Sequence, residues 1–301
     1  MAKIAVCLIA KDEERYLLEW MAYNLVLGFD EILVYDNDSV DGTRRLVEQA
    51  GEKDRRIRYV PWPGVPGRSP QVTAYNHALA NTDADWIAFI DADEFIVLRE
   101  HDTIGEFLAG FDESAGAVCL HWRLFGSSGH AVYADDLVIR RFTRCDKIYH
   151  NHVKSIVRRS CMARMHIHVG RLSSGTYVDA NGEPVTPQYK IEPVPSRHPA
   201  SINHYVLKSA EEYRNKVERG EASKPPDSPT KRAKFTPAFW PALDRNDGED
   251  FAIARVIPAL EIEMARLLSG PDPVVEERCG AWHRLMTLIK APRSGPTRRG
   301  T

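Results

Sequence analysis

Short apolar runs alternate with amphipathic segments over the first hundred residues of the chain. Four runs have the length and composition of buried strands: residues 4–9, 32–35, 57–60 and 86–90. Three intervening segments carry apolar side chains at helical spacing: residues 13–27, 41–50 and 70–80. Gly28 and Gly51 stand where the first two helices are expected to end. The alternation predicts an α/β fold, with a mostly parallel sheet flanked by helices and joined by right-handed crossovers.

The pattern becomes richer in strands after residue 116. Further strands, which would add a mixed β extension to the sheet, are expected at three places: residues 116–122, 137–142 and 153–158. Residues 170–200 carry five prolines and are expected to be less ordered. Residues 209–219 have the spacing of a helix.

The C-terminal part of the chain predicts a change of organisation. Helices are expected near residues 249–268 and 276–290, followed by a basic tail over residues 293–301. We therefore expect three parts: residues 1–220 as one domain with halves 1–100 and 101–220, residues 221–247 as a proline-rich linker or loop, and residues 248–301 as helices and tail.

Composition places the chain among ordinary soluble proteins. The 301 residues are 43% apolar and carry a net charge of -2, so no bulk attraction to nucleic acid is expected. The five cysteines lack any Cys-x-x-Cys spacing and indicate reduced thiols in a cytoplasmic protein. The first apolar run is too short for export or membrane crossing. Peripheral contact of the basic tail with an anionic membrane stays open beside a solvated tail, and the pattern sets no oligomeric state.

The most informative motif is the acidic cluster Asp91-Ala92-Asp93-Glu94, which directly follows a predicted buried strand. Residues two apart in an extended segment point the same way, so Asp91 and Asp93 can aim at one point. Carboxylate oxygens suit Mg²⁺ or Mn²⁺ carrying a phosphate group. The alternative is a solvated acidic turn.

Polar residues also follow the first two predicted strands, as Lys11-Asp12-Glu13 and Asp36-Asn37-Asp38-Ser39. Ligands of parallel sheets bind beyond the carboxyl ends of the strands. Acidic groups at three strand ends would repel one another unless a cation or hydrogen-bond donors lie between them. A metal with a nucleotide would supply both, although Asp36, Asn37 and Ser39 could equally form a turn and helix cap.

Four segments taken in order resemble a known family of enzymes. They are KDEERYLLEW (11–20), YDNDSVDGT (35–43), DWIAFIDADEF (85–95) and INHYVLKSAEEY (202–213). The chain is similar to glycosyltransferases of the GT-A fold, which is Rossmann-like. It resembles glycosyltransferase family 2, and most of all the family-92-like relatives of that family.

The resemblance implies transfer of a sugar from a nucleoside diphosphate sugar, UDP being the expected nucleotide, to a hydroxyl of a glycan or other acceptor. Residues 1–100 would bind the nucleotide and residues 101–220 the acceptor. Asp91 and Asp93 would bind Mn²⁺ or Mg²⁺ and the diphosphate or ribose of the donor. Asp36 and Asn37 would contact the base, and Asp12 or Glu13 would lie near the nucleotide. Asp38 departs from the glycine usual in family 2, and either lies at the surface or faces the base.

Later residues supply further candidates, each with a structural alternative. The resemblance implies a late histidine at the metal, for which His204 is the first choice and the alternating pair His166 and His168 the second. Lys154 could neutralise the leaving diphosphate, as could other cations: Arg158, Lys208 or Arg214. Trp122 is either a sugar-facing aromatic or a core residue. A donor-contacting role for Gln71, Tyr75 and Asn76 competes with packing or helix capping.

The reaction of the family would be an inverting displacement, which needs a carboxylate base near the acceptor hydroxyl. Asp135 and Asp136, which follow an aromatic turn, are the candidates for this base. Two other functions stay open, namely a nucleotidyltransferase and a non-catalytic protein that binds a nucleotide or sugar. A nucleotidyltransferase would usually carry a glycine-rich basic loop after the first strand, where this chain has Lys11-Asp12-Glu13.

Overall fold

The computed structural model of the chain describes residues 2–221, 223–229 and 239–269. The predicted helix over residues 276–290 and the predicted basic tail lie outside the described residues. No helix within the described ranges combines the length and apolar character that crossing a bilayer would require.

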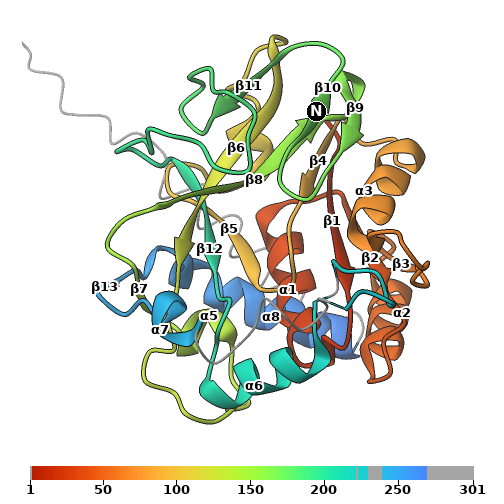
Figure 1. The fold of residues 1–301 in the computed structure, drawn as a ribbon, viewed down its shortest axis with the longest axis vertical. Coiled ribbons are helices and arrows are strands. Elements are labelled where there is room, and N and C mark those ends of the chain that lie inside the picture. The colour runs from red at the N-terminus through yellow and green to blue at the C-terminus, as the bar shows by residue number, and fades with distance from the viewer. Residues whose placement is uncertain (1, 222, 230–238, 270–301) are drawn as a thin grey trace, which may run out of the picture.

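A mixed sheet of nine strands forms the centre of the described structure (Figure 1). Its main path runs through eight strands in this order: β3 (Ile57–Pro61), β2 (Glu31–Asp36), β1 (Ile4–Ala10), β4 (Trp86–Phe89), β8 (His150–Arg158), β6 (Ala115–Leu124), β12 (Ala200–His204) and β5 (Glu94–Leu98). The ninth strand, β11 (Thr176–Asp179), pairs with β6. The first four strands are parallel, and β8 pairs antiparallel with both β4 and β6. The four predicted strands of the first hundred residues are thereby confirmed.

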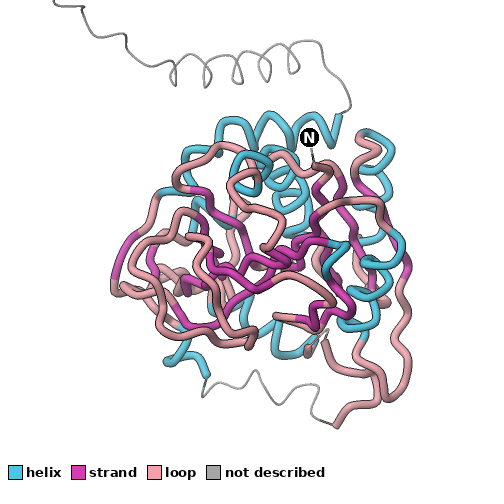
Figure 2. Tube along the Cα trace, turned by 90° about the horizontal axis from the view of Figure 1, so that it is seen from above, coloured by secondary structure: helices cyan, strands magenta, loops and turns pink. Residues whose placement is uncertain are grey.

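Alternate residues of the parallel strands face two different helical layers. Ile4, Val6 and Leu8 of β1 pack in one core with Trp20 of α1 (Glu14–Leu27) and Leu260 of α8 (Ile257–Ser269). The intervening residues of β1 pack in a second core with α3 (Pro70–Asn81). The period of two along a strand explains this division. Figure 2 shows the sheet between helices on its two sides.

The remaining elements connect or flank this framework. The helices are α2 (Thr43–Lys53), α4 (Ile104–Leu108), α5 (Val138–Arg141), α6 (Ala210–Arg219) and α7 (Trp240–Leu243), with 3-10 turns at Arg159–Cys161 and Ala252–Val256. Two small antiparallel pairs join β9 (Met162–Met165) to β10 (Gly170–Leu172) and β7 (Arg144–Cys145) to β13 (Gly248–Glu249). Helix α6 begins with a capping box in which Ser209 and Glu212 satisfy each other's backbone N–H groups.

Three local predictions were wrong. The predicted strand over residues 137–142 contains helix α5, because the buried Glu19 carboxylate accepts hydrogen bonds from Val138 and Ile139 at the start of that helix. Gly51 lies inside α2, where a Cβ atom would stand 3.0 Å from the Ile57 carbonyl oxygen of β3. His166 and His168 lie in the turn between β9 and β10, so strand alternation does not place them on one face.

The pairing of β5 with β12 brings a late segment of the chain to the acidic cluster at residues 91–94. Strand β12 lies between β6 and β5, and its antiparallel register with β5 sets His204 opposite Glu94. The Tyr205 N–H group donates to the Asp93 carbonyl oxygen at 2.8 Å. A segment more than a hundred residues downstream is thus fixed to the acidic cluster, and α6 follows it directly.

Candidate functional site

Hydrogen bonds join the turn after β1 to the turn after β2. Asp12, which has a positive φ of 51°, accepts a hydrogen bond from the Val40 N–H at 2.7 Å. Its own N–H donates to the Ser39 hydroxyl at 2.9 Å. The Lys11 ammonium donates to the carbonyl oxygens of Asn37 and Asp38. The sequence prediction that these two polar strand ends meet at one edge of the sheet is therefore confirmed.

Asp36 and Asp38 both shape the second turn. The buried Asp36 accepts hydrogen bonds from the Ser39 N–H at 3.1 Å and from the Tyr59 hydroxyl at 2.9 Å. Asp38 has a positive φ of 55° and accepts from the Gly64 N–H at 2.8 Å. Asp36 therefore has the turn-forming contacts that its sequence allowed, and contact of Asp36, Asn37 or Asp38 with a base stays a prediction.

Asp91 lies at the carboxyl end of β4 in contact with three side chains. One carboxylate oxygen accepts from the Lys154 ammonium of β8 at 2.9 Å. The other accepts from Gln71 at 2.8 Å and from the Tyr75 hydroxyl at 3.3 Å, both on α3. Burial acts to raise the pKa of Asp91, but the charge of Lys154 holds that pKa below its usual range. Asp91 is thus ionised, and its side chain remains 35% exposed.

Asp93 lies between two groups that arrive from the late part of the chain. Its carboxylate accepts a short hydrogen bond from the Lys216 ammonium of α6, and its other oxygen lies 3.7 Å from Nε2 of His204. Burial acts to raise the pKa of Asp93, but the charge of Lys216 holds that pKa well below its usual range. Burial lowers the pKa of His204, which favours the neutral imidazole.

Glu94 is the buried third carboxyl group of the acidic cluster. It is fully buried, accepts a hydrogen bond from the Asp91 N–H at 2.8 Å, and lies 3.4 Å from the Lys154 ammonium. Burial raises the pKa of Glu94 to about 8, so this carboxyl is largely protonated at neutral pH. We call the five side chains the acid–lysine cluster: Asp91, Asp93, Glu94, Lys154 and Lys216.

Four histidines surround Trp122 next to this cluster. The ring of His204 lies 4.3 Å from the Trp122 ring, and His152 stacks on Trp122 at 5.1 Å with an interplanar angle of 6°. His168 and His150 lie at 5.4 and 6.4 Å. We call these five residues the Trp122 platform. The platform reaches the acid–lysine cluster through His204, which contacts both Trp122 and Asp93.

Helix α6 closes the side of the site next to the turn after β1. Arg219 donates to the carbonyl oxygens of Lys11 and Asp12 and pairs with Glu13 at 2.7 Å. A cavity of about 320 Å³ lies beside this contact, with Asp12, Glu13 and Lys216 among its lining residues. The helix therefore joins the first strand end to Asp93.

The other candidates named from the sequence lie apart from this centre. Asp135 accepts a hydrogen bond from the Tyr133 hydroxyl, and Asp136 forms an exposed ion pair with Arg140 at 2.6 Å. His166 is exposed on the turn between β9 and β10. A role for Asp135 or Asp136 as the base stays a prediction.

The donor types around Asp93 fit a divalent cation. Two carboxylates and a neutral imidazole are ligands that Mn²⁺ accepts, and the buried Nδ1 of His204 has no hydrogen-bond partner in the described part of the chain. Among these same residues, no three His, Cys, Asp or Glu side chains already form a cation site. Lysine ammonium groups instead contact both aspartates. Lys154 is buried by that pairing, so its predicted contact with a leaving diphosphate stays a prediction.

Sequence reasoning missed Lys216 and two of the four platform histidines. Lys216 lies on one stripe of α6 with Glu212 and Arg219, at spacings of four and three residues, which predicts a shared helix face. His150 and His152 alternate along β8, and this pattern predicts that both rings lie on one side of the strand.

The family model for glycosyltransferase family 92 matches residues 2–246, most of the chain. The chain belongs to glycosyltransferase family 92. The predicted family and the predicted α/β fold of the GT-A type are thereby confirmed, with the mostly parallel sheet and flanking helices described above.

Curated relatives are similar over shorter stretches. A glycosyltransferase family 92 protein of Ricinus communis is 28% identical over 35% of this chain and 18% of its own length. A family 92 protein of Oryza sativa subsp. japonica is 26% identical over 52% of this chain and 26% of its own length. An uncharacterized glycosyltransferase of Rickettsia typhi is 31% identical over 38% of this chain and 35% of its own length. The chain thus matches about a fifth to a third of these relatives.

Two solved structures are similar to part of the chain. Glucosyl-3-phosphoglycerate synthase from Mycobacterium tuberculosis, solved with Mn²⁺ and UDP, is 25% identical, with a TM-score of 0.31 over 40% of this chain and 44% of its own. TarS of S. aureus in complex with UDP is 18% identical, with a TM-score of 0.35 over 53% of this chain and 47% of its own.

Proposed function

We propose that this protein transfers a sugar from a nucleoside diphosphate sugar, with UDP as the expected nucleotide, to a hydroxyl of a glycan or other acceptor. The observation that carries the proposal is the position of Asp91 and Asp93 at the carboxyl end of β4, in a chain that belongs to glycosyltransferase family 92. Ligands of such sheets bind at this edge.

The donor would lie across the ends of β1, β2 and β4. Asp12, Glu13, Asp36 and Asn37 would border the nucleotide, and the acid–lysine cluster would meet the diphosphate. A leaving diphosphate requires positive charge, and Lys216 brings an ammonium group to this point. Asp91, Asp93 and His204 would hold a Mn²⁺ or Mg²⁺ ion, which would supply further positive charge to the phosphate oxygens.

The acceptor would lie on the side of the Trp122 platform. Residues 1–100 would then serve the donor and residues 101–220 the acceptor. An aromatic ring bordered by imidazoles offers an apolar face for a sugar ring together with hydrogen-bonding nitrogens for its hydroxyl groups. We propose an inverting displacement, in which a carboxylate base removes the acceptor proton, with Asp135 and Asp136 as the first residues to test.

The donor prediction is tested by thermal shift with UDP, GDP, CMP and dTDP sugars, each with and without Mn²⁺. We expect a UDP-sugar to raise the melting temperature most, and to do so only with Mn²⁺, because bound ligand stabilises the folded state alone. The Asp91→Ala/Asp93→Ala variant should lose this shift. The Asp83→Asn variant, which removes an exposed carboxylate paired with Lys3, should retain it.

Two results of this screen would count against the proposal. Stabilisation by another nucleotide and not by UDP would refute the expected donor. Full stabilisation of the double variant by UDP and Mn²⁺ would refute the proposed donor site. Hydrolysis of the selected donor by the purified protein separates an enzyme from a non-catalytic binding protein.

Trp122 gives a separate prediction for the acceptor side. We expect Trp122→Ala to lower kcat/KM for the acceptor by about fivefold or more, taking as a guide the roughly 1–3 kcal/mol that an aromatic side chain contributes to stacking with a nucleobase. The donor-induced thermal shift should stay unchanged. Steady-state kinetics with varied acceptor would measure the effect, and the Trp86→Phe variant, which alters a buried core tryptophan, serves as control. A loss confined to donor binding would contradict the assignment of Trp122.

A further inference from the structure

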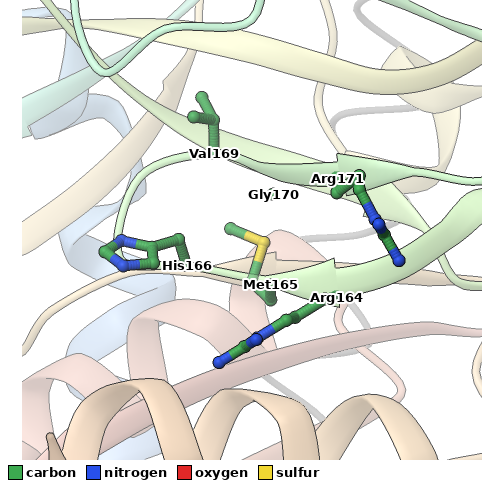
Figure 3. Close-up of a pocket in the computed structure, with 6 residues that line it drawn as sticks. All are labelled: Arg164, Met165, His166, Val169, Gly170 and Arg171. Atoms are coloured by element: carbon green, nitrogen blue, oxygen red, sulfur yellow. The ribbon is translucent and has the colours of Figure 1, made fainter.

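Two arginines stand directly opposite each other on the small β9–β10 hairpin. The antiparallel register pairs Arg164 with Arg171, and the ladder becomes irregular immediately after Arg171. Both side chains are exposed, and neither has a hydrogen-bond or ion-pair partner among the residues that the structure describes. Figure 3 shows both arginines and His166 around Met165.

This pairing is unfavourable unless something else compensates for it. Like charges directly opposite on neighbouring strands destabilise a sheet, and a two-stranded hairpin is only marginally stable on its own. The strands also approach closely, since a Cβ atom on Gly170 would lie 2.3 Å from the Arg164 carbonyl oxygen. The two side chains extend in different directions in Figure 3, and a bound anion that both guanidinium groups contact would turn the repulsion into attraction.

The space around the pair is lined by positive charge and is large enough for an anion carried by a larger molecule. A cavity of about 590 Å³ is lined by Arg164, Arg171 and His166, with Met165 and Val169 as apolar neighbours. A second cavity of about 370 Å³ shares both arginines and adjoins Asn76 of α3. Neither cavity has an Asp or Glu among its described lining residues. Arginine forks bind phosphate oxygens in pairs, so this lining suits a phosphate group.

The hairpin connects this site to the proposed acceptor side. Its turn carries His168, which is part of the Trp122 platform, three residues before Arg171. Three residues of chain span at most about 10 Å, which limits the distance between the Cα atoms of His168 and Arg171. Helix α3 contacts both the acid–lysine cluster and the hairpin. Gln71 and Tyr75 of this helix contact Asp91. Asn76 forms two hydrogen bonds with the Met165 backbone of β9. The hairpin and α3 thus connect the arginine pair to the Trp122 platform and to Asp91.

We infer that Arg164 and Arg171 bind a phosphate group carried by the acceptor, so that the acceptor of this protein is a phosphorylated sugar. The inference rests on the proposed function for its acceptor, whereas the anion site itself follows from the hairpin. His166 borders the same cavity and adds a third hydrogen-bond donor.

The first test measures anion binding without turnover. Calorimetry and thermal shift would compare inorganic phosphate, glucose 6-phosphate and glucose at constant ionic strength, in the native protein and in the Arg164→Gln, Arg171→Gln and Arg55→Gln variants. Arg55 is an exposed arginine in the turn before β3 and is the matched control. We expect the phosphates to bind the native protein and Arg55→Gln, and to bind neither hairpin variant. In phosphate-free buffer the hairpin variants should melt no lower than the native protein, because each loses a like-charge contact.

The second test separates this inference from the proposed function. UDP with Mn²⁺ should stabilise the hairpin variants as it does the native protein, and the Asp91→Ala/Asp93→Ala variant should still bind phosphate. With phosphorylated acceptors, each hairpin substitution should raise KM by about tenfold and change kcat little. The reason is that each arginine would contribute to binding of the acceptor and not to the reaction step. KM for unphosphorylated sugars should not change.

Several outcomes would overturn the inference. Equal phosphate binding by native and hairpin variants would remove the site. Arginine-dependent binding to vesicles containing anionic phospholipid, with no preference for phosphorylated sugars, would assign the hairpin to a membrane surface instead. If no nucleotide sugar stabilises the protein while phosphate still binds at the hairpin, the proposed function and the acceptor assignment both fail, and only the anion site remains.

Discussion

Replacing Asp93 by asparagine is expected to lower sugar-transfer turnover by about a hundredfold or more, because preorganised charge at the reacting centre is typically worth a factor of about 10²–10³. Asp93 is the residue on which Lys216 and His204 converge, and the Tyr205 N–H group fixes its backbone. An amide side chain would remove the negative charge that holds these groups in place. The measurement is kcat with the donor that the thermal-shift screen selects.

Two further variants test whether the loss of turnover is specific to the acid–lysine cluster. Asp83→Asn removes an exposed carboxylate and should leave kcat unchanged. Lys216→Met should lower kcat as well, and combining it with Asp93→Asn should add less than the sum of the two effects, since residues in contact are not additive. Circular dichroism would verify that each variant is folded. Native turnover by a folded Asp93→Asn variant would remove Asp93 from the proposed mechanism.

Replacing Arg141 by methionine is expected to lower the free energy of unfolding by about 3–5 kcal/mol, the usual effect of removing one partner of a buried ion pair. The guanidinium group of Arg141 donates two hydrogen bonds to Glu212, at 2.8 and 2.9 Å. The two side chains are only 3% and 1% exposed. The variant would leave Glu212 buried with its charge unpaired. Urea denaturation measures the change.

Arg140 is the matched control because it is the neighbouring arginine of the same helix. It pairs with Asp136 and Glu261 at the surface, with its side chain 41% exposed. Arg140→Met should therefore change the free energy of unfolding by less than about 1 kcal/mol. Equal losses for the two variants would show that the burial of the Arg141 pair contributes nothing to stability.

The same pair predicts a pH dependence. Burial acts to raise the pKa of Glu212, but hydrogen bonds from Arg141 and Ser209 outweigh burial and place that pKa at about 2, below its ordinary value of 4.5. A carboxyl with a depressed folded-state pKa stabilises the protein above its unfolded pKa, and this stability is lost as the pH falls toward the folded value. Stability should thus decline between pH values of about 4.5 and 2, and the decline should be smaller in Glu212→Gln.

Features that depend on residues close together in the sequence could be predicted from it. Strands β1, β2 and β4 follow from short apolar runs, and their carboxyl ends lie together because parallel strands share one edge. This relation is enough to bring Asp12, Asp36 and Asp91 to the same side of the sheet. The strand predicted at residues 137–142 is a helix in the structure, because Glu19, far away in sequence, fixes the start of α5.

Contacts between distant segments could not be predicted in this way. Nothing local in residues 94–98 shows that they pair with residues 200–204, yet this register sets His204 beside Asp93. Lys216 reaches Asp93 for the same reason, because α6 starts shortly after β12. The motif at residues 202–213 supplied a candidate histidine, and only the three-dimensional pairing identified the lysine that accompanies it.

The place of β5 in the sheet has a consequence for biosynthesis. Its strand partner in the described structure is β12, so a ribosome must add residues 99–199 before that partner emerges. Three residues of β5 are at most 2% exposed in the folded protein, namely Phe95, Ile96 and Val97. Until β12 has been synthesised, the backbone edge of β5 that pairs with it is left without its strand partner. Nascent chains in this state tend to aggregate, so efficient production of the protein should depend on chaperones during translation.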